Sequence, residues 1–365
     1  MVDEFVVLQT DIDGAVDAEN FAGRITAALS APVKFNNHEI RATVSVGFAL
    51  SPADGDSTER LLKCADLALY RAKADGRNCV RRFLAEMDWE MRARVELENT
   101  IQNAVLHNRF VLHYQPIFEV STRRLLGFEA LIRLPAADGA LIPPMTFIPI
   151  AEELHLIDKI GTWVLREACR TAALWPEHLT VAVNVSVGQF RAGGVCAAVA
   201  AALQEANLDA HRLELEITES LPLEDSESIM KELRMIKALG VVVVMDDFGS
   251  GYSSLSYLWR FPFDKIKIDQ SFMTGLGRSG RDAETVIKTI IALGRELRMH
   301  VTVEGVETAK QLSFVDEANA EQAQGFYLGR PVPESEIAAS ILADFKRASS
   351  QGTSPPEREA KLRIV

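Results

Sequence analysis

The chain has 365 residues, of which 48% are hydrophobic and 25% are charged, and its formal net charge is −12 at pH 7. This composition is typical of a folded soluble core and excludes wholesale disorder. The acidic balance argues against DNA or long RNA as a partner, because nucleic-acid binders normally present a basic face. A small anionic substrate stays compatible with it, provided that a metal supplies positive charge locally.

The sequence contains no basic and apolar signal peptide and no run of about 20 apolar residues that would span a bilayer. Its four cysteines, Cys64, Cys79, Cys169 and Cys196, form no CxxC pair, which is typical of free thiols in a reducing compartment. We therefore expect a cytoplasmic chain without membrane contact of its own. A longer parent protein would still have room for a sensor or anchor upstream.

Residues 1–85 are predicted to form a small, partial α/β fragment. The apolar FVVLQT, residues 5–10, predicts a short strand, and EIRATVSVGFAL, residues 39–50, predicts a second one. Residues 57–78 carry apolar side chains at helical spacing up to a glycine stop signal. Residues 86–108 predict a connecting helix rather than a coiled coil, because the apolar stripe does not persist as heptads.

From residue 109 to 346, apolar strands alternate with amphipathic helices. The predicted strands are 110–119, 124–133, 180–186, 212–218, 241–246, 264–269, 300–304 and 322–328, and the predicted helices include 158–174, 195–206, 226–239, 283–298, 308–318 and 334–346. Repeated βα units of this number predict a closed (β/α)8 barrel of the TIM type. An open doubly wound sheet is the alternative, but it would need a glycine-rich phosphate loop after its first strand, and the sequence has none.

The link between the first two strands, STRR at 121–124, is too short for a helical crossover. It predicts an antiparallel pair, and therefore an irregular barrel with one reversed strand. Residues 347–365 are polar and contain prolines, which predicts a disordered tail.

Polar residues that could bind metal or phosphate stand at the downstream ends of these strands. They are Glu129, Asn184, Glu216, Asp246, Asp247, Lys267 and Glu304. The carboxyl ends of barrel strands converge on one mouth, where crowded carboxylates repel one another unless a metal or a proton intervenes. Oxygen ligands favour Mg²⁺ or Mn²⁺ over zinc. The adjacent Asp246 and Asp247 are expected to point apart, so that each serves one of two cations that together clamp a phosphodiester.

Structural interpretations of the same residues stay open. Glu214 and Glu216 share a strand face, and we favour Glu216 as the ligand and Glu214 as structural. Purely structural roles would be an ion pair of Glu129 with Arg133, a helix cap for Asn184, a turn role for Asp247, a structural Lys–Asp pair of Lys267 with Asp269, and a cap or loop brace for Glu307.

Eight short motifs give residues 109–346 a family resemblance. They are YQPI at 114–117, EALIR at 129–133, NVS at 184–186, ELEITES at 214–220, DDFGSGYSSL at 246–255, KID at 267–269, EGVE at 304–307 and QGFYLGRP at 324–331. In this order they resemble a bacterial EAL domain, the phosphodiesterase class that opens the second messenger cyclic di-GMP. Two departures are Leu134, where active members often have Trp, and Ser250, where Thr is common.

The resemblance implies a set of residue roles. Glu129, Asn184, Glu216 and Asp246 would bind the first metal and Asp247 the second, while Lys267 and Glu304 would handle the nucleophilic water, with the proton acceptor left open between them. Gln115, Arg133 and Gln324 would contact the dinucleotide, Glu219 would steady the DDFGSGYS loop, and Glu307 would support the site from behind. It also implies two Mg²⁺ or Mn²⁺ ions per site, linear pGpG as product, and a homodimer formed through this domain.

Residues 3–83 resemble the second half of a GGDEF domain, the diguanylate cyclase that makes cyclic di-GMP. The matches are DEFVVL at 3–8, TVSVGFAL at 43–50 and ADLALYRAKADGRN at 65–78, with Met1 and Val2 in place of the two glycines. We expect no cyclase activity from this fragment. For the EAL-like part, the alternatives to an active enzyme are a catalytically silent cyclic di-GMP receptor and, with less support, a scaffold.

Overall fold

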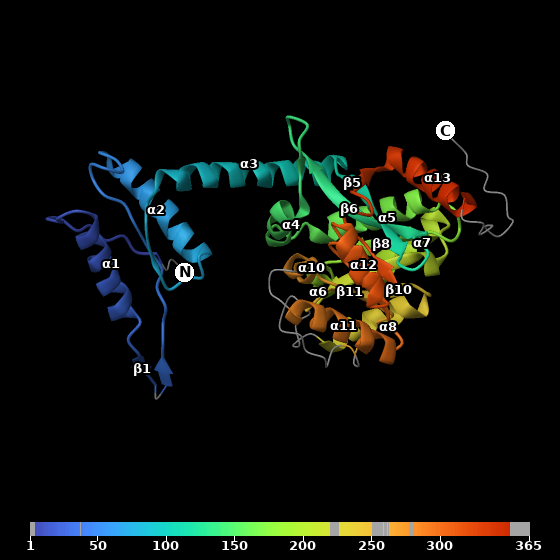
Figure 1. Cartoon of the computed structure of the whole chain (residues 1–365). Coiled ribbons are helices and arrows are strands. Elements are labelled where there is room, and N and C mark those ends of the chain that lie inside the picture. The colour runs from blue at the N-terminus through green and yellow to red at the C-terminus, as the bar shows by residue number, and fades with distance from the viewer. Residues whose placement is uncertain are drawn as a thin grey trace. The chain divides into compact units, whose positions relative to one another are not determined.

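The computed structural model describes residues 4–36, 38–219, 226–249, 258, 261, 263–276 and 281–350, and its ribbon is shown in Figure 1. The chain divides into two compact units, Met1–Asn99 and Thr100–Val365. The predicted connecting helix is α3 (Ala85–His107), and the boundary between the units lies inside it. Within the described ranges, no helix is both long and apolar enough to cross a membrane.

The first unit is built from short strands and two helices before α3. Helix α1 (Ala15–Leu29) precedes an antiparallel pair, β1 (Val33–Phe35) and β2 (His38–Ile40). Helix α2 (Thr58–Ala74) lies in the sequence between strands β3 (Val46–Phe48) and β4 (Val80–Arg82), and these two strands pair in parallel. The single strand predicted over residues 39–50 is therefore divided between β2 and β3, and residues 41–45 between them are unpaired.

The strand predicted at FVVLQT is wrong. Residues 4–10 have no strand pairing, and the side chains of Phe5 and Leu8 are 90% and 87% exposed. An apolar run forms a strand only when a neighbouring strand satisfies its backbone, and among the described residues β3 has only β4 beside it. The segment has the composition of a buried strand without the sheet that would bury it.

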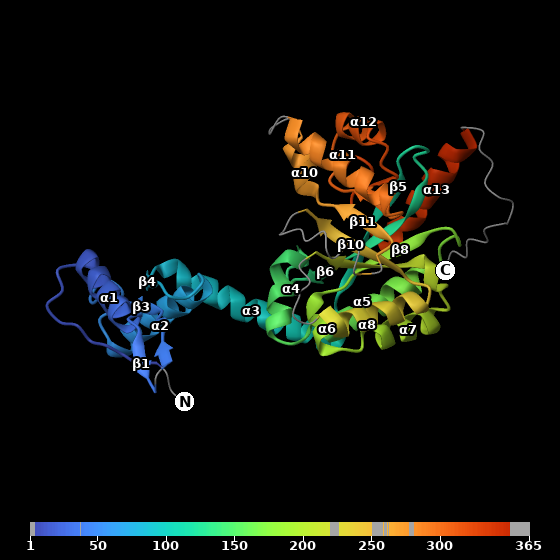
Figure 2. The ribbon, with the colours of Figure 1, turned by 90° about the horizontal axis from the view of Figure 1, so that it is seen from below.

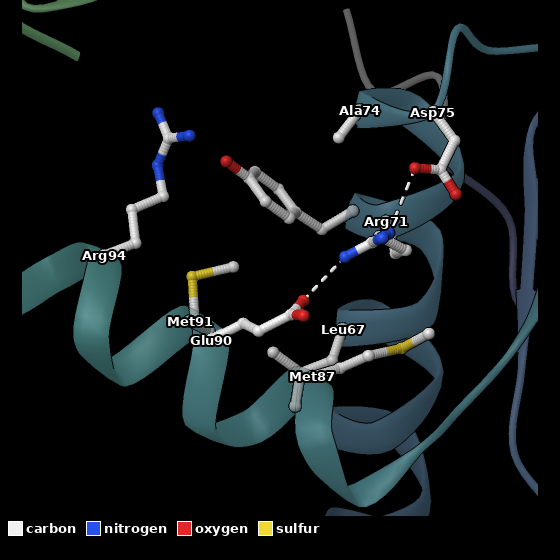
Figure 3. A pocket seen from close by; sticks show the side chains of 9 residues that line it. Leu67, Arg71, Ala74, Asp75, Met87, Glu90, Met91 and Arg94 are labelled. Carbon is white, nitrogen blue, oxygen red and sulfur yellow. Dashed lines mark hydrogen bonds and ion pairs between the residues drawn. The ribbon is translucent and has the colours of Figure 1, made fainter. Parts of the chain in front are cut away.

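The core of the first unit joins α2 to the start of α3. Cys64, Leu67 and Ala68 of α2 pack with Phe83 and Met87. Beside this core, a groove of about 230 Å³ separates the two helices, and Arg71 reaches across it to Glu90 at 2.7 Å while it also pairs at 3.0 Å with Asp75 at the end of its own helix (Figure 3). The Arg71–Glu90 ion pair and the packing of Met87 against α2 hold the first turns of α3 beside that helix.

The second unit is a closed barrel. The eight described strands that close it are β5 (Val111–Glu119), β6 (Leu125–Pro135), β8 (Thr180–Asn184), β9 (Leu213–Thr218), β10 (Val242–Phe248), β11 (Lys265–Ile268), β12 (His300–Val303) and β13 (Gln322–Ala323). They pair in this order, and β13 returns to β5. All neighbours are parallel except β5, which runs antiparallel to both β6 and β13. The predicted irregular barrel with one reversed strand is confirmed.

The barrel helices lie close to their predicted positions. They are α5 (Ile157–Ala172), α7 (Val195–Ala206), α8 (Ser226–Ala238), α11 (Arg281–Glu296), α12 (Ala309–Glu317) and α13 (Glu334–Ser350). In Figure 2, strands β10 and β11 lie between α11 and α12 on one side and α5, α7 and α8 on the other. The short elements without a predicted counterpart are α4 (Pro144–Glu153), α6 (Val187–Ala192), α10 (Gln270–Gly275), η1 (Ala210–Arg212), β7 (Leu141–Ile142) and β14 (Val332–Pro333).

Two predicted boundaries are wrong. Strand β13 covers only the first two residues of 322–328, because the chain turns at Gly325, whose carbonyl accepts hydrogen bonds from the N–H groups of Leu328 and Gly329. Helix α13 continues through Ser350, so residues 347–350 of the predicted tail are helical. The rest of that tail, 351–365, lies outside the described residues.

The barrel interior is polar at two levels. Along β9, Leu213, Leu215 and Ile217 alternate with Glu214 and Glu216, and all five are buried. Because strand side chains alternate between faces, the leucines and isoleucine pack toward the helices and the two glutamates point into the barrel. Barrel interiors are usually filled by branched apolar residues, so charged residues inside this barrel indicate a functional role.

Candidate functional site

The strand-end residues come together at one end of the barrel. Lys267 is the centre of the cluster, since its Nζ lies 2.8 Å from Glu216 Oε2 and 2.7 Å from Glu304 Oε1. It also lies 3.3 Å from Glu129 Oε2 and from Asp246 Oδ1. The Lys267 side chain is only 1% exposed. One buried ammonium therefore faces four carboxylates from four different strands or strand ends.

Glu129 is held by three donors. Asn184 Nδ2 donates to its Oε1 at 2.6 Å, and Gln324 Nε2 donates to its Oε2 at 2.7 Å, beside Lys267. The ion pair with Arg133 is not formed, since the Arg133 guanidinium donates to the carbonyl of Ile132 at 2.9 Å. Side chains from β6, β8 and the residue after β13 thus meet in a single buried network.

The contacts also decide the structural roles considered for Asn184, Asp269 and Glu214. Asn184 is not a helix cap, because α6 is capped by Ser186, whose side chain accepts from Gly188 N–H. Asp269 caps α10 instead of pairing with Lys267, since its carboxylate accepts from Ser271 N–H at 3.0 Å. Glu214 is buried and paired with Lys265 at 2.6 Å, as its structural interpretation predicts.

Asp246 and Asp247 converge, so the expectation that they point apart is wrong, whereas the assignment of one cation to each stays a prediction. Between Met245 and Phe248 the pairing of β10 with β11 slips by one residue, which is a β-bulge. Asp247 lies in the bulge with φ +55°, in the left-handed region. A bulge with this backbone breaks the alternation of side chains and re-aims one of them. Oxygens of both aspartates and of Glu304 consequently lie within 4.8 Å of one another.

The electrostatics of the cluster reflect burial and mutual repulsion. Burial and the charge of Glu129 hold the pKa of Glu216 well above its usual range. Burial also raises the pKa of Glu304 to about 8, although Lys267 opposes the shift. Burial and Asp246 raise the pKa of Asp247 to about 6, and the neighbouring Asp269 adds to this.

The pKa shifts of two other members of the cluster favour their charged forms. Burial would raise the pKa of Glu129, but Lys267 and the hydrogen bonds from Gln324 and Asn184 hold it below its ordinary value. Burial would lower the pKa of Lys267, yet Asp246, Glu129 and the other carboxylates raise it well above its usual range. Lys267 is therefore an ammonium at neutral pH, and the raised pKa values of Glu216 and Glu304 make these two carboxyls bind a proton more readily than an ordinary glutamate does.

The donor set fits divalent cations. Glu216 Oε1, Asp246 Oδ1 and Gln324 Oε1 are buried without a hydrogen-bond partner. A buried oxygen left unpaired is costly, and a cation is one group that would satisfy it. Carboxylate and amide oxygens are hard ligands of the kind that Mg²⁺ and Mn²⁺ prefer. Thiol and imidazole groups are absent from the acidic group formed by Asp246, Asp247 and Glu304.

The predicted supporting residues occupy different surroundings. Glu219 is buried, and its Oε2 accepts a hydrogen bond from Gly249 N–H at 2.9 Å. Glu307 is exposed, and its backbone N–H donates to Gln311 Oε1 at 2.8 Å. The remainder of the DDFGSGYSSL segment, including Ser250, lies outside the described residues.

The residues predicted to contact a dinucleotide surround Glu129. Gln115 is its ladder partner on β5 and donates from Nε2 to the carbonyl of Gly329 at 3.2 Å. Arg133 stands four residues further along β6, half-buried, and burial lowers the pKa of its guanidinium. Leu134, in place of Trp, is fully buried beside β7. The sequence did not single out Asp269 as part of the acidic surroundings of Asp247, although its position two residues after Lys267 places it at the same strand end.

Comparison with known proteins gives matches to two family models. Residues 98–331 match the EAL domain, and residues 2–79 match the diguanylate cyclase, GGDEF domain. A solved structure described as "PaMucR Phosphodiesterase, c-di-GMP complex" aligns with a TM-score of 0.63 and 39% identity, over 66% of this chain and 99% of that one.

Curated relatives align over almost the whole chain. An uncharacterized signaling protein of Caulobacter vibrioides is 43% identical over 98% of this chain and 44% of its own length. The bifunctional diguanylate cyclase/cyclic di-GMP phosphodiesterase MucR of Pseudomonas aeruginosa is 38% identical over 93% of this chain and 50% of its own length. The chain thus spans about half the length of these relatives.

Proposed function

The chain belongs to the EAL domain family, with a partial GGDEF region before it, and we propose that it hydrolyses cyclic di-GMP to linear pGpG with two divalent cations at the barrel mouth. The observation that carries the proposal is the set of buried oxygens on Glu216, Asp246 and Gln324 that accept no hydrogen bond, of which Asp246 Oδ1 has the Lys267 ammonium at 3.3 Å. These residues stand at the positions where the family motifs place functional groups. The substrate is proposed from relatives whose descriptions name cyclic di-GMP.

Two groups of residues would hold the cations. Glu129, Asn184, Glu216 and Asp246 lie around one position, and Asp247 with Glu304 extends the oxygens beyond it. Bound Mg²⁺ or Mn²⁺ would supply Lewis acidity and lower the pKa of water. The bulge at Asp247 matters here, because it brings the two aspartates to adjoining positions at the mouth.

Lys267 and Glu304 are assigned the two remaining roles, charge stabilisation and proton transfer, from the pKa shifts of their side chains. Lys267 is kept as an ammonium by the carboxylates around it, so it acts as a fixed positive charge toward a phosphate oxygen. A proton acceptor needs a pKa near the working pH, which the value of about 8 gives to Glu304. We therefore assign proton transfer to Glu304 Oε and charge stabilisation to Lys267 Nζ.

The dinucleotide would lie over the mouth, against residues that ring Glu129. Gln115 and Gln324 offer amide groups, and Arg133 offers a guanidinium with donors to spare beyond its bond to the Ile132 carbonyl. A guanidinium suits phosphate recognition because its donors form a planar fork. Association into a homodimer through this domain stays a prediction.

Turnover and binding, measured on the same preparation, test the proposal. Purified protein with Mg²⁺ should consume cyclic di-GMP over many turnovers. With EDTA in place of Mg²⁺ it should consume none. Tight binding in EDTA together with no turnover in Mg²⁺ or Mn²⁺ would identify a silent receptor instead, and Asp247→Ala, which should abolish turnover, provides the inactive reference.

A further inference from the structure

A second buried ion pair lies one pair of residues earlier along β9 and β11 than the Lys267–Glu216 pair. Lys265 Nζ is 2.6 Å from Glu214 Oε2, and the two side chains are 6% and 7% exposed. Lys265 and Lys267 stand two residues apart on β11, as Glu214 and Glu216 do on β9, so each strand supplies two inward-pointing charges. The Lys267–Glu216 pair belongs to the proposed site, while the Lys265–Glu214 pair has no part in the proposed chemistry.

The strand register places two carboxylates, those of Glu214 and Glu216, within reach of the Lys265 side chain. Val244 on β10 is the ladder partner of Lys265 on one side and of Glu216 on the other. The Cα atoms of Lys265 and Glu216 are therefore two strand spacings apart, about 10 Å. Side chains of these types bridge such a gap in this barrel, because both Lys265–Glu214 and Lys267–Glu216 span β10.

Glu214 is fixed in place from two sides, and Glu216 is not. One Glu214 oxygen binds Lys265, and the other accepts a hydrogen bond from Thr180 Oγ1 at 3.2 Å. A Cβ at Gly127 would lie 2.4 Å from the same Oγ1, so glycine leaves the space that Thr180 needs. Glu216, by contrast, has a buried oxygen without a hydrogen-bond partner. That free oxygen is where a second ammonium would be drawn.

We propose that Glu214 is a positioning residue that holds the Lys265 ammonium away from Glu216. While Glu214 binds Lys265, Lys267 is the ammonium that pairs with Glu216 at 2.8 Å, and Glu216 Oε1 stays available to a cation. Without Glu214, Lys265 turns to Glu216 and competes with the cation for its oxygens. This inference rests on the proposed metal site at the barrel mouth.

Breaking the same ion pair from either side separates this role from simple structural support. Glu214→Gln removes the carboxylate but keeps its size, which releases Lys265 toward Glu216. Lys265→Met removes the competing ammonium. The double variant Glu214→Gln/Lys265→Met removes both charges. Mn²⁺ affinity is measured for each variant and for wild type, without substrate, from the paramagnetic resonance signal of free Mn²⁺.

Glu214→Gln should weaken Mn²⁺ binding by about 10–100-fold, the range found for residues that orient metal ligands. Lys265→Met and the double variant should bind Mn²⁺ within about threefold of wild type. Circular dichroism and thermal melts establish that each variant is folded. Differences among the folded variants therefore measure metal affinity rather than stability.

Wild-type affinity in Glu214→Gln would overturn the inference. So would equal weakening in Glu214→Gln and Lys265→Met, or a double variant as weak as Glu214→Gln, because each would mean that the ion pair only supports the fold. Wild-type protein that binds no Mn²⁺ would instead refute the metal site of the proposed function, and this inference with it.

Discussion

Glu219 at the end of β9 accepts a hydrogen bond from the backbone N–H of Gly249, with 2.9 Å between Oε2 and N. Gly249 follows the bulge by two residues and has φ +93°. A Cβ there would lie 2.8 Å from the ring of Phe272, so the turn also depends on glycine. Glu219 thereby anchors the chain immediately after Asp247, although it is not one of the three residues whose oxygens meet in the acidic group.

Glu219→Ala should reduce cyclic di-GMP turnover by about 10–100-fold at limiting Mg²⁺, because Asp247 loses the anchor that positions it. Glu219→Gln retains an oxygen acceptor for Gly249 N–H and should keep most of the rate. Steady-state turnover at several Mg²⁺ concentrations checks both variants. A Glu219→Ala protein with the wild-type rate at limiting Mg²⁺ would show that the hydrogen bond does not position the loop.

Lys267→Met should destabilise the metal-free protein by about 3–5 kcal/mol, because it leaves buried carboxylates without their compensating charge. Urea unfolding in EDTA measures this loss. Added Mn²⁺ should restore part of it, since a cation replaces the missing ammonium. Lys159→Met, at an exposed position on α5, should change the free energy of unfolding by less than about 0.5 kcal/mol. Equal stability of the two variants in EDTA would contradict the central position of Lys267.

Mg²⁺ and Mn²⁺ should support hydrolysis, and Ca²⁺ should bind without supporting it. Ca²⁺ takes more ligands at longer distances, which spoils a compact two-cation arrangement. The assay follows turnover in Mg²⁺ as Ca²⁺ is added, and inhibition should be relieved by excess Mg²⁺. Full activity in Ca²⁺ after removal of Mg²⁺ would be inconsistent with this site.

The stabilisation conferred by Mg²⁺ should grow as pH rises from 6 to 8.5. The pKa values of Asp247 and Glu304, about 6 and about 8, lie above those of unfolded chains, so the metal-free fold binds extra protons. Their stabilising contribution is complete below about pH 4 and is lost as pH rises through about 6 and then 8. Mg²⁺ displaces these protons, and it does so more easily when fewer are bound.

Thermal melts with and without Mg²⁺ at pH 6, 7 and 8.5 measure this trend as the gain in Tm. Glu304→Gln, which cannot titrate, should flatten the part of the trend above pH 7. A gain in Tm that is largest at pH 6 would have the wrong sign for proton displacement.

The sequence predicted the barrel and the meeting of the strand-end residues at one mouth because both follow from local patterns. Apolar runs followed by Glu129, Asn184 or Lys267 mark strand ends, and the short STRR link requires the reversed strand. Parallel strands then bring their carboxyl ends together regardless of side-chain detail. The meeting of Glu129, Asn184 and Lys267 in one network follows from topology alone.

What the sequence could not predict depends on pairings between strands. The convergence of Asp246 and Asp247 requires the one-residue slip between β10 and β11, which no single segment encodes. Lys265 pairs with Glu214 rather than Glu216, and this pairing depends on how far β9 and β11 are offset from each other across β10. FVVLQT was predicted as a strand for a related reason, since its composition says nothing of whether a neighbouring strand is present.

The most direct measurement is the product of cyclic di-GMP incubated with purified protein and Mg²⁺ in ¹⁸O-labelled water, resolved by liquid chromatography and mass spectrometry. Hydrolysis predicts linear pGpG with one ¹⁸O on its terminal phosphate, and none from Glu129→Ala, which lacks the carboxylate held by Asn184 and Gln324. Recovery of intact, unlabelled cyclic di-GMP from the wild-type protein in Mg²⁺ and in Mn²⁺ would contradict the proposed hydrolysis.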